Sequence, residues 1–175
     1  MTHKKTIKNG FTLIELMIVL ALIGILCIIA VPKINDWLPR YRLKSAASDL
    51  QSNMQKARML AIKENNSVQI RFDNSVSPGF YYFDTINDDV YTAGEFRVDL
   101  STYKFGVDFG SGAAVSNWNN TACTQATAIS FGTRGTANQA TVYLQNQDIL
   151  VCYAVTTSIA GTGKLRIYTG NNWIE

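Results

Sequence analysis

Residues 10–32 read GFTLIELMIVLALIGILCIIAVP, and this stretch organises the rest of the 175-residue chain. From Phe11 to Val31 only Thr12 and Glu15 carry polar side chains. As a helix rising about 1.5 Å per residue, this segment would extend about 32 Å, close to the ~30 Å hydrocarbon core of a bilayer. The sequence therefore predicts a membrane-spanning helix over residues 11–32.

Glu15 is the exception in this apolar segment. A carboxylate at the centre of a bilayer costs about 2.5–3.5 kcal/mol, so an acidic residue there indicates a function. An alternative interpretation places Glu15 at the headgroup boundary, near the start of the helix, where its cost is small. Both interpretations are open at this point.

The residues before Gly10 are basic. Lys4, Lys5 and Lys8 lie there without an acidic residue, which predicts a cytoplasmic N-terminus by the positive-inside rule. The apolar segment is too long for a cleaved secretory signal, and no Ala-x-Ala site follows it. Without these three lysines, the 16 basic residues of the chain would fall to the number of its 13 acids. A near-neutral chain argues against a general polyanion-binding role.

Residues 10–15 (GFTLIE), behind a short basic leader and ahead of an apolar helix, resemble the class III signal of type IV pilins and type II secretion pseudopilins. The resemblance implies that prepilin peptidase removes residues 1–10 by cutting between Gly10 and Phe11, and then methylates the new amine of Phe11. It also implies that Glu15 pairs with such an amine when subunits leave the membrane and form a filament.

The same resemblance gives the expected location and partners. The chain would cross the bacterial inner membrane once, with a cytoplasmic N-terminus and a periplasmic head, before it enters a pilus or pseudopilus. Its partners would be other pilin or pseudopilin subunits, the prepilin peptidase and the inner-membrane assembly platform. Gly24 and Pro32 both weaken helices, so we expect the helix to break between these two positions when the subunit is in a filament.

Residues 33–175 are expected to form one globular head. Its first part carries apolar residues at alternating spacings of four and three, which predicts an amphipathic helix over about residues 36–63: Leu43, Ala47, Leu50, Met54, Ala57 and Ala61. After Ser67 the pattern changes to strands, expected over residues 68–73, 80–83, 96–100, 103–109, 128–131, 141–145, 149–155 and 165–169. A helix followed by strands predicts an α+β fold, with the long N-terminal helix packed on an antiparallel sheet, as in type IV pilins.

The second half carries a narrower resemblance. Residues 129–136 (ISFGTRGT), 141–144 (TVYL) and 163–167 (GKLRI) are similar to the C-terminal half of H-type minor pseudopilins and FimT-like minor pilins. This implies a structural subunit, a minor pilin or pseudopilin. The alternative is a DNA-binding minor pilin of an uptake pilus, in which Lys164 and Arg166 would contact phosphates. Two cations on one strand are more often plain surface.

No catalytic constellation is found. His3 is the single histidine and lies in the leader, so the mature chain would have no Ser-His or Cys-His pair and no histidine metal ligand. We therefore expect that the protein is not an enzyme and that it binds neither a cofactor nor a metal. Asp84, Asp88 and Asp89 are typical of a solvated acidic loop, with calcium binding as the alternative.

The cysteines leave two interpretations open. Cys123 and Cys152 would lie outside the cytoplasm, where two cysteines in one domain usually pair, so a disulfide between them is expected. Two buried free thiols are the alternative. Cys27 lies in the apolar segment and is interpreted as a small apolar residue of the helix.

Overall fold

A computed structural model of the protein describes residues 11–104, 106–146 and 149–175. For residues 29–36 it describes the backbone but not the side chains. The chain divides into two compact units, Met1–Trp37 and Leu38–Glu175. The described residues form a long helix, nine strands and one 3₁₀ turn: α1 (Leu13–Glu64), β1 (Val68–Asp73), β2 (Phe80–Asp84), β3 (Arg97–Asp99), η1 (Leu100–Tyr103), β4 (Val107–Phe109), β5 (Ala128–Phe131), β6 (Ala140–Asn146), β7 (Cys152–Thr157), β8 (Gly163–Tyr168) and β9 (Trp173–Ile174).

Helix α1 continues through Gly24 and Pro32 in this single chain, and the break expected there in a filament stays a prediction. Proline removes one backbone hydrogen bond, and glycine weakens a helix by about 1 kcal/mol relative to alanine. Both effects are local, and the leucines and isoleucines on either side favour helix. The amphipathic helix expected over about residues 36–63 is accordingly the last part of α1.

Among the residues whose side chains are described, no helical stretch is both long enough and apolar enough to cross a membrane. The span expected over residues 11–32 includes positions 29–32, whose side chains lie outside the described ones.

The two asparagines after Glu64 end α1. Asn65 adopts a left-handed conformation with φ of 50°, and the Asn66 N–H donates to the carbonyl of Ala61 at 3.2 Å. This arrangement is the Schellman motif, in which a residue with positive φ lets the chain turn back onto the last helical carbonyls. It directs the chain from α1 into β1.

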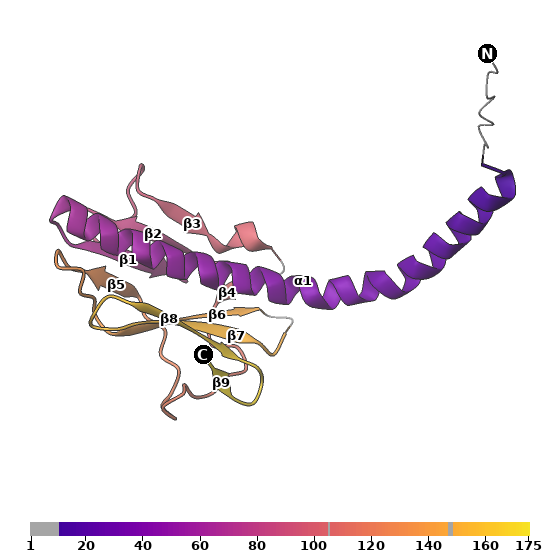
Figure 1. The fold of residues 1–175 in the computed structure, drawn as a ribbon. Coiled ribbons are helices and arrows are strands. Elements are labelled where there is room, and N and C mark those ends of the chain that lie inside the picture. Colours follow the sequence, from indigo (N-terminus) through magenta and orange to yellow (C-terminus); the bar gives the residue numbers. More distant parts are fainter. Residues whose placement is uncertain (1–10, 105, 147–148) are drawn as a thin grey trace, which may run out of the picture. The chain divides into compact units, whose positions relative to one another are not determined.

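The strands of the head pair antiparallel, as expected, but they form two sheets rather than one (Figure 1). The first has the order β3-β2-β1-β5, and the second has the order β4-β6-β7-β8-β9. The segment before β5 joins them: the Phe72 N–H donates to Thr127 O at 2.9 Å, and the Ala126 N–H donates to Thr141 O at 3.0 Å. Residues 126 and 127 thus bond to β1 on one side and to β6 on the other, which links the two sheets.

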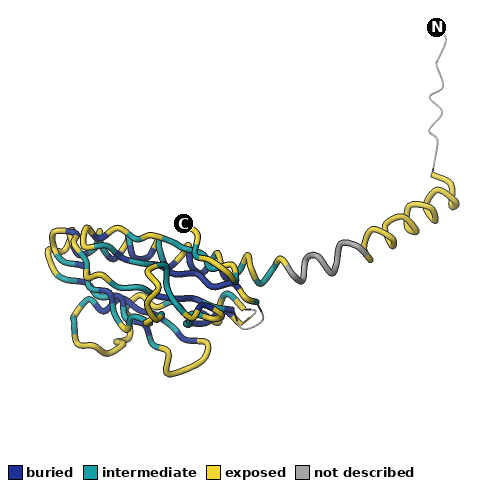
Figure 2. The backbone as a smooth tube through the Cα atoms, turned by 90° about the horizontal axis from the view of Figure 1, so that it is seen from below, coloured by how far each residue is buried: buried dark blue, intermediate teal, exposed yellow. Residues whose placement is uncertain are grey.

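The predicted apolar stripe of α1 forms the centre of the core. All six of its residues are at most 1% exposed, namely Leu43, Ala47, Leu50, Met54, Ala57 and Ala61. They pack with inward-facing residues of both sheets, such as Ile70, Ile129 and Val155 (dark blue stretches in Figure 2). Each large apolar side chain buried in this way stabilises the head by about 1.5–3 kcal/mol.

Polar contacts fix how α1 lies on the head. Gln51 Nε2 donates to Gly163 O at 2.9 Å, and Arg58 Nε donates to Gly135 O at 2.9 Å. Burial raises the pKa of Tyr81 to about 12, and its hydroxyl accepts a hydrogen bond from Asn53 Nδ2 at 2.7 Å. The helix and the sheets are thus held together by polar as well as apolar contacts.

The strand predictions are confirmed with two main corrections. The strand expected over residues 103–109 is wrong in its first half, because η1 ends at Tyr103 and β4 begins only at Val107. Lys104 has φ of 59° and Gly106 has φ of 67°, which an extended strand does not allow. The two-residue strand β9 was not predicted. It pairs with β8 through Trp173, opposite Tyr168.

Candidate functional site

The first turn of α1 holds Glu15 in a capping box. The Thr12 N–H and the Thr12 hydroxyl both donate to Glu15 Oε2, at 2.9 and 2.8 Å. In return the Glu15 N–H donates to Thr12 Oγ1 at 3.2 Å. This is the reciprocal pattern of a Thr-x-x-Glu sequence at a helix start. Thr12 thus holds the Glu15 carboxylate in place, a role that was not predicted for it from the sequence.

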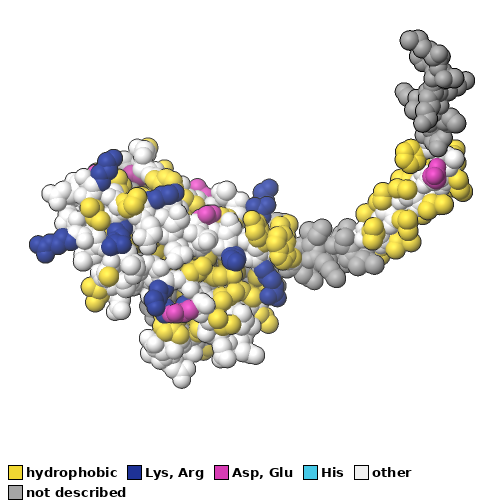
Figure 3. All heavy atoms as spheres, in the orientation of Figure 1, with side chains coloured by type: hydrophobic (Ala, Val, Ile, Leu, Met, Phe, Trp, Pro, Cys, Tyr) yellow, Lys and Arg dark blue, Asp and Glu magenta, His cyan; other side chains and the backbone are white. Residues whose placement is uncertain are grey.

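Apolar side chains surround this box. Phe11 is 93% exposed, and α1 presents exposed leucines, isoleucines and valines along residues 13–28 (Figure 3). Glu15 is the one acidic residue among them. Gly10, on the other side of the expected cleavage point, lies outside the described residues. Residues 11–28 therefore present a continuous apolar surface with a single carboxylate near its start.

In the head, Lys164 and Arg166 lie on β8 and share one acidic partner. Lys164 Nζ lies 3.5 Å from Glu175 Oε1, and the Arg166 guanidinium forms an ion pair with the same oxygen. The hydrogen bond from Arg166, followed by the charge of Lys164, lowers the pKa of Glu175. Arg166 also stacks on Trp118, with its guanidinium carbon 4.0 Å from the ring centroid. Trp118 is remote from β8 in sequence, and Glu175 follows Arg166 by nine residues; sequence reasoning found neither.

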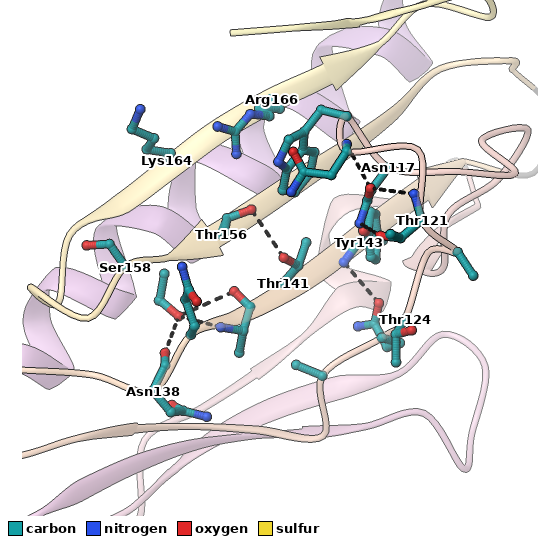
Figure 4. A pocket seen from close by; sticks show the side chains of 18 of the residues that line it. Asn117, Thr121, Thr124, Asn138, Thr141, Tyr143, Thr156, Ser158, Lys164 and Arg166 are labelled. Carbon is teal, nitrogen blue, oxygen red and sulfur yellow. Dashed lines mark hydrogen bonds between the residues drawn. The ribbon is translucent and has the colours of Figure 1, made fainter.

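A groove of about 780 Å³ lies beside these cations (Figure 4). Residues of β6, β7 and β8 line it, together with the loop that precedes β5. Lys164 and Arg166 lie at one side of the groove and Thr124 at the other, with Thr141 and Thr156 between them (Figure 4). The candidate DNA contacts thus belong to a larger polar surface.

Comparison with known proteins assigns the family. Residues 46–161 match the model of the type II transport protein GspH, and residues 6–31 match that of the prokaryotic N-terminal methylation motif. The chain belongs to the GspH family. The type IV major fimbrial protein FimA of Dichelobacter nodosus is 31% identical over 122 residues, which cover 65% of this chain and 74% of FimA. A fimbrial protein of Pseudomonas aeruginosa is 44% identical over 61 residues, 35% of this chain and 39% of that protein.

The fold agrees with this assignment. The crystal structure of the type IV minor pilin FimU of Pseudomonas aeruginosa matches this GspH-family chain with a TM-score of 0.52. The match covers 78% of this chain and 95% of that one, at 15% identity. The resemblance to type IV pilins and pseudopilins and the expected α+β pilin fold are both confirmed. The chain is a minor pilin or pseudopilin, a structural subunit.

The alternative of a DNA-binding subunit is not favoured by these findings. Lys164 and Arg166 both interact with Glu175, so this part of β8 offers less net positive charge to a phosphate backbone than two free cations would. The DNA contact of Lys164 and Arg166 stays a prediction.

The acidic loop of the GspH-family chain is held by internal hydrogen bonds. Asp84, which is fully buried, accepts the N–H groups of Asp88 and Asp89 at 3.3 and 3.0 Å. Arg71 forms ion pairs with Asp84 and Asp89. Within the described part of the chain, no group of three metal-ligating side chains is found. These carboxylates therefore stabilise the conformation of the loop.

Cys123 and Cys152 are free thiols in the structure, rather than the expected disulfide. Each thiol also lies beside another group: Cys123 beside Tyr143, and Cys152 beside the backbone of Ala114. Burial, and then the neighbouring Cys123, raise the pKa of Cys152 to about 12. The two thiols are therefore near each other, and Cys152 is protonated at neutral pH.

We expect mild oxidation of the folded protein to link Cys123 to Cys152 without involving Cys27. Cys123 is partly exposed and lies close to Cys152, so an oxidant can reach the pair from that side. Peptide mapping by mass spectrometry without reductant would detect the link, and Cys123→Ser is the control that must abolish it. Recovery of all three cysteines as alkylated thiols after oxidation would contradict the expectation.

Proposed function

We propose that this minor pilin or pseudopilin is cut between Gly10 and Phe11, is held in the bacterial inner membrane by residues 11–32 with its head in the periplasm, and then enters a filament. The observation that carries the proposal is the Thr12–Glu15 capping box at the start of an exposed apolar helix. A carboxylate with a local partner can stay in an apolar environment until a better partner arrives.

The capping box supports this order of events energetically. Thr12 gives the Glu15 carboxylate two neutral donors, which reduce but do not remove the cost of burying its charge. A cationic donor adds Coulomb attraction to the carboxylate, which neutral donors lack and which is strongest where water is excluded. Cleavage before Phe11 creates a cationic amine, so the amine of one subunit is a stronger partner for Glu15 of another than Thr12 is. This stronger interaction of Glu15 favours transfer of the subunit from the membrane to the filament.

The apolar surface of residues 13–28 supplies the second contribution. Exposed apolar patches larger than a few hundred square ångströms are rare on soluble monomers and mark contact with other proteins or with lipid. In the proposed cycle, lipid covers this surface first and the helices of other subunits cover it later. The expected partners are thus other pilin or pseudopilin subunits, after processing by prepilin peptidase and with help from the inner-membrane assembly platform.

Processing is the first step to test. We expect mass spectrometry of the protein from its native host to find an N-methylated phenylalanine at position 11 as the first residue. A peptidase that acts at this bond needs close access to the residue before it, and glycine offers the least obstruction. Gly10→Val should therefore accumulate as the uncleaved precursor, whereas Thr6→Val, in the same leader, should be cleaved normally. An intact Met1, or a first residue beyond Val31, would refute the proposal.

A further inference from the structure

The floor of the groove beside Lys164 is built from the outer face of three strands. Thr141, Thr156 and Lys164 are cross-strand neighbours on β6, β7 and β8. The alternate residues of these strands, such as Val142 and Val155, face the core. The outward residues are therefore not needed for packing, and the groove they line has a volume of about 780 Å³, within the range of ligand sites.

The lining is rich in uncharged hydrogen-bonding groups. Hydroxyl and amide side chains are contributed by residues including Thr124, Asn138, Thr141, Thr156 and Ser158. The described lining contains no carboxylate, and Lys164 and Arg166 are its charged residues. Such a surface does not suit an apolar ligand, because it would leave hydroxyl and amide groups without partners. It suits a ligand that carries many oxygen atoms.

Gln125 provides an independent indication of a ligand. Its Oε1 accepts the Tyr143 N–H at 2.9 Å, which fixes the orientation of the amide. Its Nε2 is buried and has no hydrogen-bond partner among the described residues. Gln125 is part of the groove lining. A buried donor without a partner is unfavourable, and an acceptor oxygen from a ligand would satisfy it.

The central strand of the floor offers no free backbone edge, because β7 is paired with both β6 and β8. Strand β9 pairs with β8 only at Ile167 and Tyr168. A ligand that lies over β7 must therefore be bound by side chains. Trp118 contributes an aromatic ring to the lining, and Arg166 is held in place between this ring and Glu175.

We propose that this groove binds an oligosaccharide that carries carboxylate or acetamido groups. The sugar hydroxyls would bond to the threonine and asparagine side chains. The carbonyl or carboxylate oxygens would accept from Gln125 Nε2, Lys164 and Arg166. The binding surface is separate from α1 residues 13–28, so an assembled subunit could still present it.

The test uses the full-length protein in a detergent without a sugar headgroup, titrated calorimetrically with three hexasaccharides. Oligogalacturonate carries carboxylates, chitohexaose carries acetamido groups, and maltohexaose carries hydroxyls alone. We expect saturable binding of one of the first two, at least about tenfold tighter than that of maltohexaose. The sugar that binds more tightly shows whether the groove recognises a carboxylate or an acetamido carbonyl. Failure of both, or equal binding of all three, would overturn the proposal.

Two variants locate the site. Gln125→Glu keeps the acceptor for the Tyr143 N–H but removes the unpaired donor, and Thr156→Val removes a hydroxyl with little change of shape. Each should weaken binding about fivefold or more, while Thr102→Val, exposed on η1 outside the groove, should not change it. The melting temperature of each variant shows whether the head stays folded. Unchanged affinity in both folded variants, or displacement of the sugar by short duplex DNA, would contradict the proposal.

Discussion

Glu15→Ala should leave the protein in the inner membrane and remove it from the filament. Alanine keeps the helix propensity of α1 and makes the segment more apolar, so insertion and cleavage should proceed. What is lost is the partner for the amine of a neighbouring subunit. Removing one member of a buried charge pair costs about 2–5 kcal/mol, which corresponds to a more than tenfold loss of assembled subunit. Immunoblotting of sheared filaments against the membrane fraction measures this ratio.

Two matched variants separate pairing from capping. Glu15→Gln keeps an acceptor for the Thr12 donors, because glutamine also serves in a capping box, but it cannot form an ion pair. Thr12→Val removes the hydroxyl and keeps the charge of Glu15. We expect Glu15→Gln to fail in assembly almost as severely as Glu15→Ala, and Thr12→Val to assemble with a smaller defect. Wild-type assembly of both Glu15 variants would show that Glu15 is not an assembly contact.

The sequence predicted the elements whose side chains repeat with a clear period. The residues from Leu43 to Ala61 follow one face of a helix, and all six are buried in the core. The bounds of β1 and β5 agree with the expected residues 68–73 and 128–131. Where backbone conformation overrides the pattern, the prediction failed. Lys104 and Gly106 have positive φ and interrupt an apolar stretch that otherwise suggests a strand.

The candidate site was predictable only where its partners are close in sequence. Glu15 and Thr12 are three residues apart, so the capping box is present in the sequence pattern. Glu175 and Trp118 approach Arg166 only because β9 pairs with β8 and because the loop before β5 folds over the sheet. Such contacts depend on how the strands pair with one another. The residue pattern of a single strand does not determine this pairing. The groove could not have been found before the sheets were assembled.

A second large loss of stability is expected on substitution of Gly161, which lies against Gly135. Gly135 in turn contacts α1 through Arg58. Gly161 has φ of 71°, in the left-handed region, and a Cβ added there would lie 2.0 Å from the carbonyl oxygen of Gly135. That oxygen also accepts the hydrogen bond from Arg58 Nε on α1. The obstruction is backbone rather than a flexible side chain, so a rotamer change cannot relieve it. The hairpin between β7 and β8 would have to move away from residue 135.

Gly161→Ala should therefore destabilise the head by about 3–5 kcal/mol. Positive φ alone costs a non-glycine residue about 1–3 kcal/mol, and the collision and the weakened Arg58 contact add to this. Gly170→Ala is the matched control, because Gly170 has φ of 96° but no atom within 4 Å of an added Cβ. Gly170→Ala should therefore lose only the free energy that positive φ costs a non-glycine residue. The difference between the two in urea denaturation, followed by tryptophan fluorescence, isolates the contact with Gly135. Equal stabilities would show that the hairpin adjusts freely and that this contact does not hold α1 on the head.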